Sequence, residues 1–339
     1  MLEDRWEGLL GHTNNKSIYQ SYKWISTCWE YFGGDGLYLL AASQDDQILG
    51  IAPLMVEQMR VKGLPLFRIL RFIGSGPSDY LDFILKKGWE RNVLDGFIAY
   101  LVKDKQSWDI MWLSELPEDS STNELLPSIL SKYRLEYLSE EQSRCPYIEL
   151  PPTWGEYERT LSRTTRNNVK MYSKRIARSG MVEHKTIDDR QAIASAMDDF
   201  FSLHEGRWRD DERGHDRTET IKSFHHHAAV KLSDNLNLYF MLLDNKKIAS
   251  IYSYDYDSTR YFYWIGWDKD YAHCSPGFIA IANRIEDAIQ RGMKGFDFLR
   301  GDEPYKYHFT KKEKINNRYF VSNSRLKMKL FLFLEKRSG

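Results

Sequence analysis

The sequence has few cysteines, no long apolar run and no excess of charge of either sign. Cys28, Cys145 and Cys274 are scattered, and no pair has the spacing of a zinc, redox or disulfide-rich site. No apolar run approaches the roughly 18 residues of a membrane span, and the first residues, MLEDRWEGLL, have no basic flank leading into an apolar run of signal-peptide length. Lys plus Arg equals Asp plus Glu at 48 each, which excludes a globally basic DNA-binding protein. These absences predict a cytoplasmic protein without a membrane span.

Motifs of several common enzyme classes are also missing. The sequence contains no G-x-x-x-x-G-K-[ST] loop, no G-x-S-x-G elbow and no H-E-x-x-H pair. His225, His226 and His227 are consecutive in a predicted helix, so they point in three directions and cannot form the i, i+4 pair of a zinc site. We therefore expect no metal.

What is present is material for a large core. The chain has 339 residues, of which 42% are hydrophobic and 14% aromatic, and this length suits two domains of about 100–200 residues. Strands and helices alternate in both halves, which predicts the α/β class. We expect mixed sheets, with parallel and antiparallel strands, as in α+β proteins. Pro151-Pro152 is the best boundary and gives domains 1–150 and 151–339.

The second half has the clearest element pattern. We expect a helix over Trp154–Ala177 that is interrupted near Ser162, and a second helix over Gly277–Arg291. The halves also echo each other, because residues 37–54 and 238–255 both read as strand, polar tight turn, strand. This echo indicates either an ancient duplication or two unrelated α/β domains that each contain a hairpin.

Ser275-Pro276-Gly277 is the first candidate site. It opens the second of these helices, after a strand that ends near Trp267. Serine at the cap and proline in the first turn leave backbone N–H groups pointing outward, and with the helix dipole they favour phosphate. An ordinary capped helix is the alternative interpretation.

The segment Gly295–Phe309 is the second candidate. Asp297 stands between Phe296 and Phe298 in a short strand, so it lies on the opposite face from them. Glu303, Tyr305 and Lys306 follow the carboxyl end of that strand, where open α/β sheets place ligands. Asp297 is either a catalytic base or a structural partner of a residue such as Arg300.

The end of the helix before residue 209 is the third candidate. His204, Arg207 and Trp208 share a helical face through spacings of three and four residues. A histidine can act as a general base near neutral pH. The alternative is a solvated helix end.

A basic stripe is the fourth candidate. Between Arg159 and Arg178 there are seven basic residues and no acidic one. Arg163, Arg166 and Lys170 are spaced so that they line one helical face, together with further cations. Such a face suits the phosphates of a nucleotide, a cofactor tail or a polymer, although many charge runs are only solvated surfaces.

Several segments together resemble a known family. LHEGRW, FHHHAAVKL, LNLYFMLLDNKKIAS and YWIGWDKDYAHCSPGFIAIANRIEDAIQRGMKGFDFLRGDEPYKYHF follow the order seen in the acyltransferase domain of CelD-type cellulose-biosynthesis proteins. RFIGSGPSDYLDFIL resembles the N-terminal region of the same group. The group belongs to the GNAT superfamily and is related to FemAB peptidyltransferases. AHCSPG stands here in place of the usual Q/R-x-x-G-x-G/A signature.

The resemblance implies two tandem GNAT-like domains, the first degenerate or acceptor-binding and the second catalytic. It implies transfer of an acyl group from acetyl-CoA or another acyl-CoA to the amine of a small molecule or glycan, in cell-surface polysaccharide biosynthesis. The acceptor would be an amino sugar, an amino-acid-like amine or a lipid amine. No DNA partner is implied. The implied cofactor contacts are Ile265, Trp267, Ser275, Gly277 and Phe278.

The implied catalytic groups are a base among Asp297, Glu303 and His204, and Tyr305 as the proton donor to the departing thiolate. A backbone N–H in the stretch from Ile265 to Trp267 would polarise the thioester carbonyl. The candidate substrate contacts combine residues of the sites described above with Tyr263: Arg207 and Trp208 of the helix end, Lys306, and Arg163, Arg166 and Lys170 of the basic stripe.

Two other functions stay open. A FemAB-like transferase would take its group from aminoacyl-tRNA, held by the basic stripe, and pass it to a peptidoglycan precursor. A non-catalytic polysaccharide-assembly protein would instead use its aromatic side chains to bind sugar.

Overall fold

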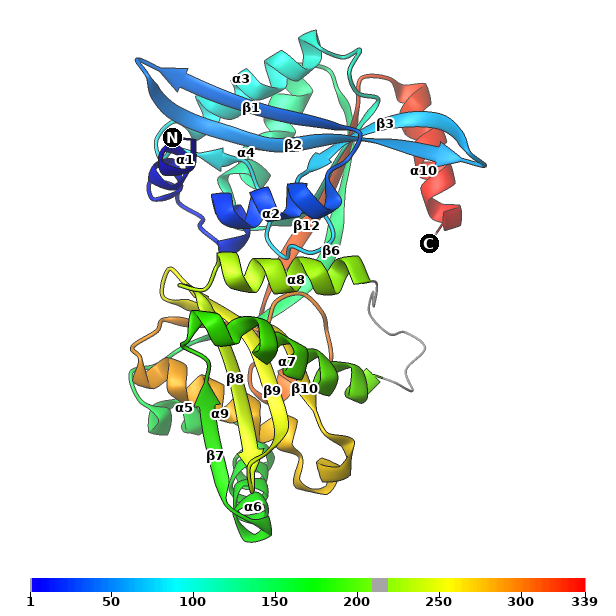
Figure 1. The fold of residues 1–339 in the computed structure, drawn as a ribbon. Coiled ribbons are helices and arrows are strands. Elements are labelled where there is room, and N and C mark those ends of the chain that lie inside the picture. Colours follow the sequence, from blue (N-terminus) through cyan, green and yellow to red (C-terminus); the bar gives the residue numbers. More distant parts are fainter. Residues whose placement is uncertain (1, 209–218, 339) are drawn as a thin grey trace. The chain divides into compact units, whose positions relative to one another are not determined.

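The structure, a computed structural model, describes residues 2–208 and 219–338 (Figure 1). The chain divides into two compact units, of which the first contains residues 1–143 and 314–339 and the second residues 144–313. Both units combine helices with mixed sheets, which confirms the predicted fold class. Among the described residues, no helix has the length and apolar character needed to cross a membrane.

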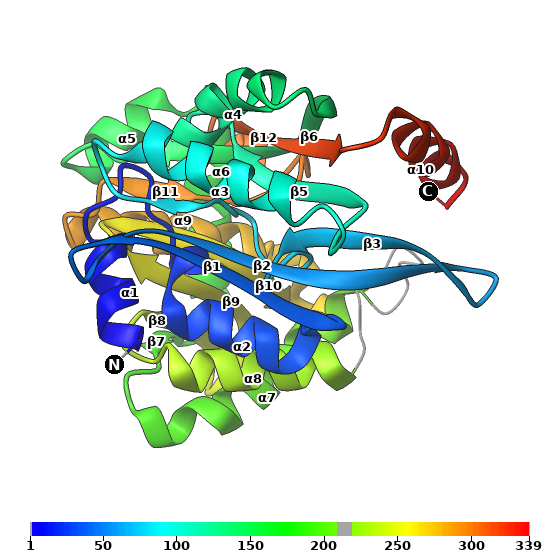
Figure 2. The same cartoon turned by 90° about the horizontal axis from the view of Figure 1, so that it is seen from above.

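The first unit is built on a sheet in the strand order β1-β2-β3-β5-β12. β3 and β5 are parallel, whereas the other neighbours are antiparallel. Figure 2 shows helices on both sides of these strands. The elements are α1 (Leu2–Leu10), η1 (Ile18–Gln20), α2 (Tyr22–Phe32), β1 (Gly36–Gln44), β2 (Gln47–Val61), β3 (Leu64–Phe72), β4 (Ile84–Leu85), α3 (Glu90–Lys103), β5 (Ile110–Pro117), α4 (Ser121–Lys132), β12 (Lys312–Ser322) and α10 (Arg325–Ser338).

The second unit has the strand order β7-β8-β9-β10-β11, and the end of β6 (Glu136–Glu149) pairs with β11. β10 and β11 are its parallel pair. The remaining elements are α5 (Trp154–Thr160), α6 (Arg163–Ser179), β7 (Val182–Thr186), η2 (Arg190–Ala192), α7 (Ile193–Trp208), α8 (Glu219–Lys231), β8 (Leu236–Leu243), β9 (Lys246–Tyr256), β10 (Thr259–Trp267), η3 (Lys269–Cys274), α9 (Pro276–Gln290), β11 (Gly295–Asp297) and η4 (Lys306–His308).

The two units repeat one order of elements. In the first, the hairpin β1–β2 is followed by β3, α3 and β5, and in the second the hairpin β8–β9 is followed by β10, α9 and β11. In each unit the strand before the helix is parallel to the strand after it, with Ile69 opposite Ile110 and Thr259 opposite Gly295. The tandem arrangement is thus present, and its repetition favours duplication as the origin of the sequence echo.

The end of the second unit differs from the expected range of 151–339. Residues 314–339 belong to the first unit, because β12 pairs with β5 from Asn316 opposite Pro117 to Ser322 opposite Ile110. α10 then packs its Met328 and Phe331 against Phe67 and Phe320 of the same unit. The last strand of the chain therefore lies in the first unit, next to β5.

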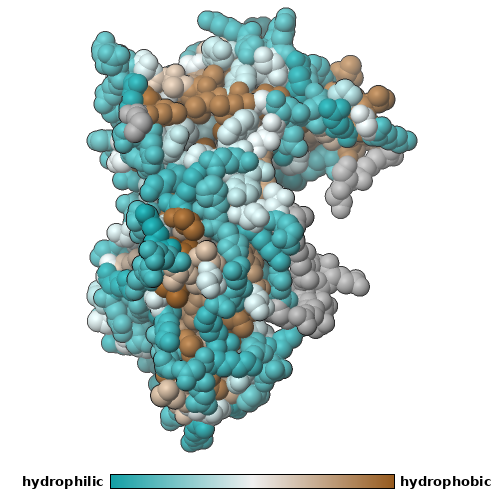
Figure 3. Space-filling model, viewed as in Figure 1, coloured by the Kyte–Doolittle hydropathy of each residue, from teal (hydrophilic) through white to brown (hydrophobic). Residues whose placement is uncertain are grey.

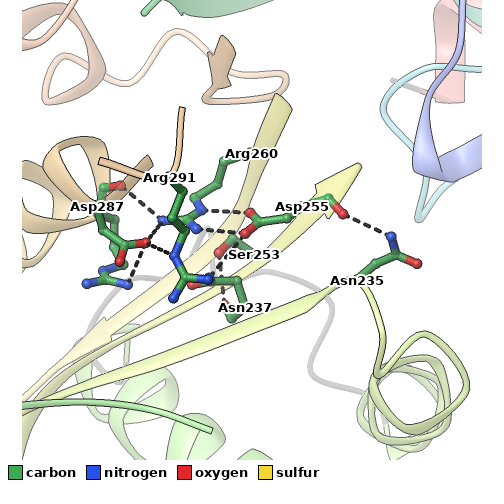
Figure 4. A network of polar contacts seen from close by, with 8 residues as sticks. Asn235, Asn237, Ser253, Asp255, Arg260, Asp287 and Arg291 are labelled. Carbon is green, nitrogen blue, oxygen red and sulfur yellow. Dashed lines mark hydrogen bonds and ion pairs between the residues drawn. The ribbon is translucent and has the colours of Figure 1, made fainter. Parts of the chain in front are cut away.

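A buried arginine fixes the elements around the candidate site (Figure 4). The side chain of Arg260 on β10 is fully buried, and its Nε and Nη2 each lie 2.7 Å from an oxygen of Asp255 on β9. Its Nη1 donates to Asp287 of α9 at 2.6 Å. Burial alone would raise the pKa of Asp287, but the guanidinium groups of Arg284 and Arg260 hold it below its usual value. The network therefore ties α9 to the sheet.

Candidate functional site

The parallel strands β10 and β11 form the frame of the site. Their registered pairs run only from Thr259 opposite Gly295 to Tyr261 opposite Asp297, whereas β10 continues along β9 to Trp267. A register shift between Phe262 and Trp264 marks a β-bulge in β10. The carboxyl ends of parallel strands are where α/β sheets bind ligands, so the stretch of β10 beyond its last pair with β11 is the natural place for one.

The start of α9 lies against this stretch of β10. A Cβ atom added to Gly277 would lie 2.9 Å from Cδ1 of Trp267 and 3.4 Å from Cδ1 of Ile265, so only glycine permits this approach. Ser275 is the N-cap residue in the left-handed conformation, with φ of 50°, and its side chain caps no N–H. The first turn of α9 contains no acidic residue. The dipole of a 15-residue helix therefore meets no negative side chain there.

One of the predicted backbone donors at the start of α9 remains available. The N–H of Ser275 donates to the carbonyl of Ala272 at 3.0 Å, and the N–H of Phe278 donates to that of Ser275 at 3.1 Å. Within the described part of the chain, the N–H of Gly277 donates to no group. Gly277 is thus the strongest of the predicted phosphate contacts.

The basic helix α6 lies beside the segment that leads into α9. Nη1 of Arg175 donates to the carbonyl of His273, and the ring of Tyr172 contacts that of Phe278 with centroids 6.0 Å apart. Lys174 and Arg178 are exposed within a turn of Arg175, and neither pairs with an acidic side chain of the described residues. These two cations add positive charge next to the start of α9.

The predicted stripe on α6 divides into paired and unpaired cations. Arg166 donates to the carbonyl of Leu161 at 2.8 Å, and Lys170 lies 3.2 Å from an oxygen of Glu158, so both hold α6 to the end of α5. Arg163, at the first position of α6, is exposed. The structure thus gives Arg166 and Lys170 a structural contact, and their binding of substrate stays a prediction.

The loop after β11 is held by two buried charged side chains. Oδ1 of Asp297 accepts from the N–H of Leu299 at 2.8 Å, and Leu299 has a φ of 58°. Nζ of Lys306, whose side chain is only 3% exposed, donates to the carbonyls of Leu299, Arg300 and Gly301 and lies 2.9 Å from Glu303. Lys306 therefore holds the loop in place. These contacts engage the ammonium group that was predicted to contact the substrate.

His204 lies on the face of β10 that α7 covers. A Cβ atom on Gly266 would lie 2.4 Å from the backbone N of His204, so glycine lets α7 approach β10 closely. The imidazole is stacked between Phe200 and Trp264, with centroids 5.5 and 5.1 Å away, and its Nδ1 lies 3.0 Å from the carbonyl oxygen of Ile265. A carbonyl can only accept, so Nδ1 carries the proton and Nε2 is the basic nitrogen of the neutral ring.

Asp297 and Tyr263 share this face with His204. Phe296 belongs to the core on the α9 side, and side chains alternate along a strand, so Asp297 and its neighbour Tyr261 face the other way. Burial and the charge of Asp297 raise the pKa of Tyr261. The ring of Tyr263 packs 5.0 Å from that of Trp264 on the same side.

A second buried histidine, for which the sequence predicted no role, lies on this face. His225 of α8 is 1% exposed, and its ring lies 4.3 Å from that of Trp264 and 5.0 Å from that of Tyr263. Burial holds the pKa of His225 well below its ordinary value, so the ring is neutral. The hydroxyl of Tyr252 lies 3.5 Å from Nδ1 of His225 and is hydrogen-bonded to that of Tyr254. The alternating tyrosines of YSYDY in β9 were the sequence feature that could have indicated this buried aromatic cluster.

The structure gives the position of one more predicted residue, Tyr305, and leaves two others undescribed. Tyr305 is half-buried and packs against the core of the second unit, next to η4. The side chains of Arg207 and Trp208 lie outside the described residues. In the ranges that the structure describes, no cluster of His, Cys, Asp and Glu could hold a metal ion.

Comparison with known proteins agrees with this geometry. Residues 163–307 match the model of the acetyltransferase (GNAT) domain family. The fold is similar to the crystal structure of FemX, with a TM-score of 0.68 and 12% identity over 99% of this chain and 98% of that one. It is also similar to the C-terminal domain of a putative lysylphosphatidylglycerol synthetase from Agrobacterium fabrum, with a TM-score of 0.59 and 10% identity over 97% and 93%.

A further similar structure is L-PGS from Bacillus licheniformis, with a TM-score of 0.57 and 8% identity over 98% of this chain and 95% of that one. No curated protein matches the chain in sequence. At these identities the structures establish the fold alone. Residues 163–307, which match the acetyltransferase (GNAT) domain model, lie within the second unit, and this match supports an acyltransferase.

Proposed function

We propose that the second unit transfers an acyl group from acyl-CoA to an amine acceptor. The observation that carries this proposal is the free N–H of Gly277 at the start of α9, beside the stretch of β10 that continues past β11. A helix start without acidic residues suits a diphosphate, and the cations of α6 lie next to it. The residues present therefore fit the diphosphate of a CoA thioester.

The chemistry requires the acceptor to lose a proton as it attacks the thioester carbon. We assign the base to His204, because its imidazole packs against Trp264 on the face of β10 that the acceptor would approach and its Nδ1 is held by the carbonyl of Ile265. Asp297 and Glu303 are the alternatives, and both also hold the loop after β11. A backbone N–H of β10 between Ile265 and Trp267 would stabilise the developing oxyanion, and Tyr305 would protonate the departing thiolate.

The acceptor would approach the face of β10 that carries His204 and Tyr263. The aromatic rings on this face suit the apolar side of a sugar, an amino-acid-like amine or a lipid amine. The resemblance to CelD-type proteins supports a role in cell-surface polysaccharide biosynthesis. The first unit would bind or position the acceptor.

Aminoacyl-tRNA is the second candidate donor. The length of α6 favours it, because a 17-residue helix with unpaired cations offers phosphate contacts beyond those that one diphosphate needs. The acceptor would then be a peptidoglycan precursor, as in FemAB-like transferases.

A thermal-shift titration with CoA, acetyl-CoA and a longer acyl-CoA tests the donor. A ligand that binds only the folded state adds about 2.7 kcal/mol of stability at one hundred times its Kd. We expect the double variant Lys174→Ala, Arg178→Ala to bind about fivefold to tenfold more weakly. Lys294→Ala, an exposed lysine just beyond the opposite end of α9, is the matched control. Stabilisation by charged tRNA but by no thioester would overturn the acyl-CoA proposal.

A further inference from the structure

Helix α10 of the first unit has more apolar surface than its packing uses. Met328 and Phe331 face the core, and the ring of Phe331 lies 5.9 Å from that of Phe67 and 5.3 Å from that of Phe320. Leu326, Leu330 and Phe333 are 76%, 42% and 51% exposed. Their spacing of four and three residues places them on one helical face. Hydrophobic side chains at the surface over α10 are visible in Figure 3.

Cations flank this apolar face. Arg325 and Lys329 are exposed, and Lys327 pairs with Asp109. The sequence of α10 contains one acidic residue, Glu335, which lies 3.4 Å from Nη1 of Arg318. The exposed side of α10 therefore combines leucines with positive charge, and its one carboxylate is already paired.

The tip of the β2–β3 hairpin repeats this combination. Leu64 is 73% exposed and Leu66 is 40% exposed, while Arg60 and Lys62 are exposed beside them. Cross-strand partners share a face, so the pairs Met59–Phe67 and Val61–Leu64 place Leu64 on the same side of the hairpin as Phe67. Phe67 contacts α10, and Figures 1 and 2 both show α10 at the end of this unit where the hairpin projects.

We propose that the exposed face of α10 and the tip of the β2–β3 hairpin form a docking surface for an anionic lipid bilayer. Apolar side chains flanked by Lys and Arg are the combination by which a surface helix enters the headgroup region of a membrane. The negative potential of anionic lipids complements the cations, at about 1 kcal/mol for each Lys or Arg near the surface. This surface belongs to the first unit and does not depend on the donor proposed for the second.

Co-sedimentation with lipid vesicles tests the proposal. We expect the full chain to bind vesicles of phosphatidylcholine and phosphatidylglycerol better than vesicles of phosphatidylcholine alone, and to lose binding as salt is added. The double variant Leu326→Glu, Leu330→Glu should bind the anionic vesicles with an affinity at least about tenfold lower than that of the wild type. The control is Tyr100→Glu, at a 52% exposed position of α3 in the same unit, which should bind like the wild type.

The single variant Lys329→Glu separates the charge contribution. It should weaken binding to anionic vesicles and leave the small residual binding to neutral vesicles unchanged. Circular-dichroism melts that coincide with the wild type show that each variant is folded. Failure of the wild type to bind anionic vesicles, or equal binding by the double variant, would overturn the proposal. Dimers that the double variant dissociates, without vesicle binding, would identify the face as a protein interface and equally overturn it.

Discussion

At the scale of single residues, Gly277 is decisive because its missing side chain lets α9 approach β10. Gly277→Ala would normally strengthen a helix, but here the new Cβ would lie 2.9 Å from Trp267. We expect a loss of about 1–3 kcal/mol in the free energy of unfolding of the second unit, together with weaker donor binding. Gly155→Ala in α5, where the added Cβ would have no atom of a packing neighbour within 4 Å, should instead stabilise by about 0.4–1 kcal/mol. Chemical denaturation of both variants measures the contrast, and equal stabilisation by both would contradict the packing argument.

Sequence patterns identified single residues better than they identified what those residues contact. The many ionisable residues in and after β11 identified Asp297 and Lys306 as candidate site residues. The Lys306 ammonium, however, contacts the carbonyls of Leu299 and Gly301, in a loop where both residues have positive φ, and no spacing in the sequence predicts that backbone path. His225 escaped prediction for a related reason, because its aromatic neighbours come from strands that helical spacing cannot reveal.

At the scale of elements, the buried Arg260 network holds β9, β10 and α9 together. Arg260→Met would leave the carboxylates of Asp255 and Asp287 without their main partner. We expect a loss of about 3–5 kcal/mol in the free energy of unfolding, as for other broken buried ion pairs. Arg291→Ala removes a half-exposed arginine that also pairs with Asp287, and it should cost less than about 0.5 kcal/mol. A small effect of Arg260→Met in urea denaturation would mean that the sheet does not depend on this network.

Helices whose ends are indicated by capping residues in the sequence were predicted correctly to within one or two residues. The helix expected over Trp154–Ala177 is divided at Ser162, whose side chain accepts from the N–H of Thr165 at 3.0 Å and caps α6. The expected Gly277–Arg291 helix is α9, shifted by one residue at each end. The pairing of β12 with β5 was not predictable, since Asn316 and Pro117 lie far apart in sequence and no turn fixes their register.

At the scale of the whole molecule, a buried carboxyl group of the first unit makes stability depend on pH. Burial raises the pKa of Asp82 in the first unit to about 7, from the ordinary value of 3.8. The folded state therefore keeps a proton that the unfolded state releases, and stability falls as pH rises from about 4 to about 7 and is level above that. Asp82→Asn should remove this dependence and raise stability at pH 8 by up to about 4 kcal/mol.

Hydrogen exchange of β3 and β5 reports the stability of the first unit alone. Asp45→Asn, in the exposed turn between β1 and β2, is the matched control and should keep the pH dependence of the wild type. A pH dependence that survives in Asp82→Asn would show that another group carries it.

The most direct test of the central claim follows the backbone amide of Gly277 by NMR while CoA or acetyl-CoA is added. We expect a large shift of the Gly277 resonance that saturates with the donor and needs about fivefold to tenfold more donor in Lys174→Ala, Arg178→Ala. The amide of Gly155, outside the proposed site, should not move. A Gly277 resonance that stays in place at saturating donor would contradict the claim that the start of α9 holds the donor's phosphates.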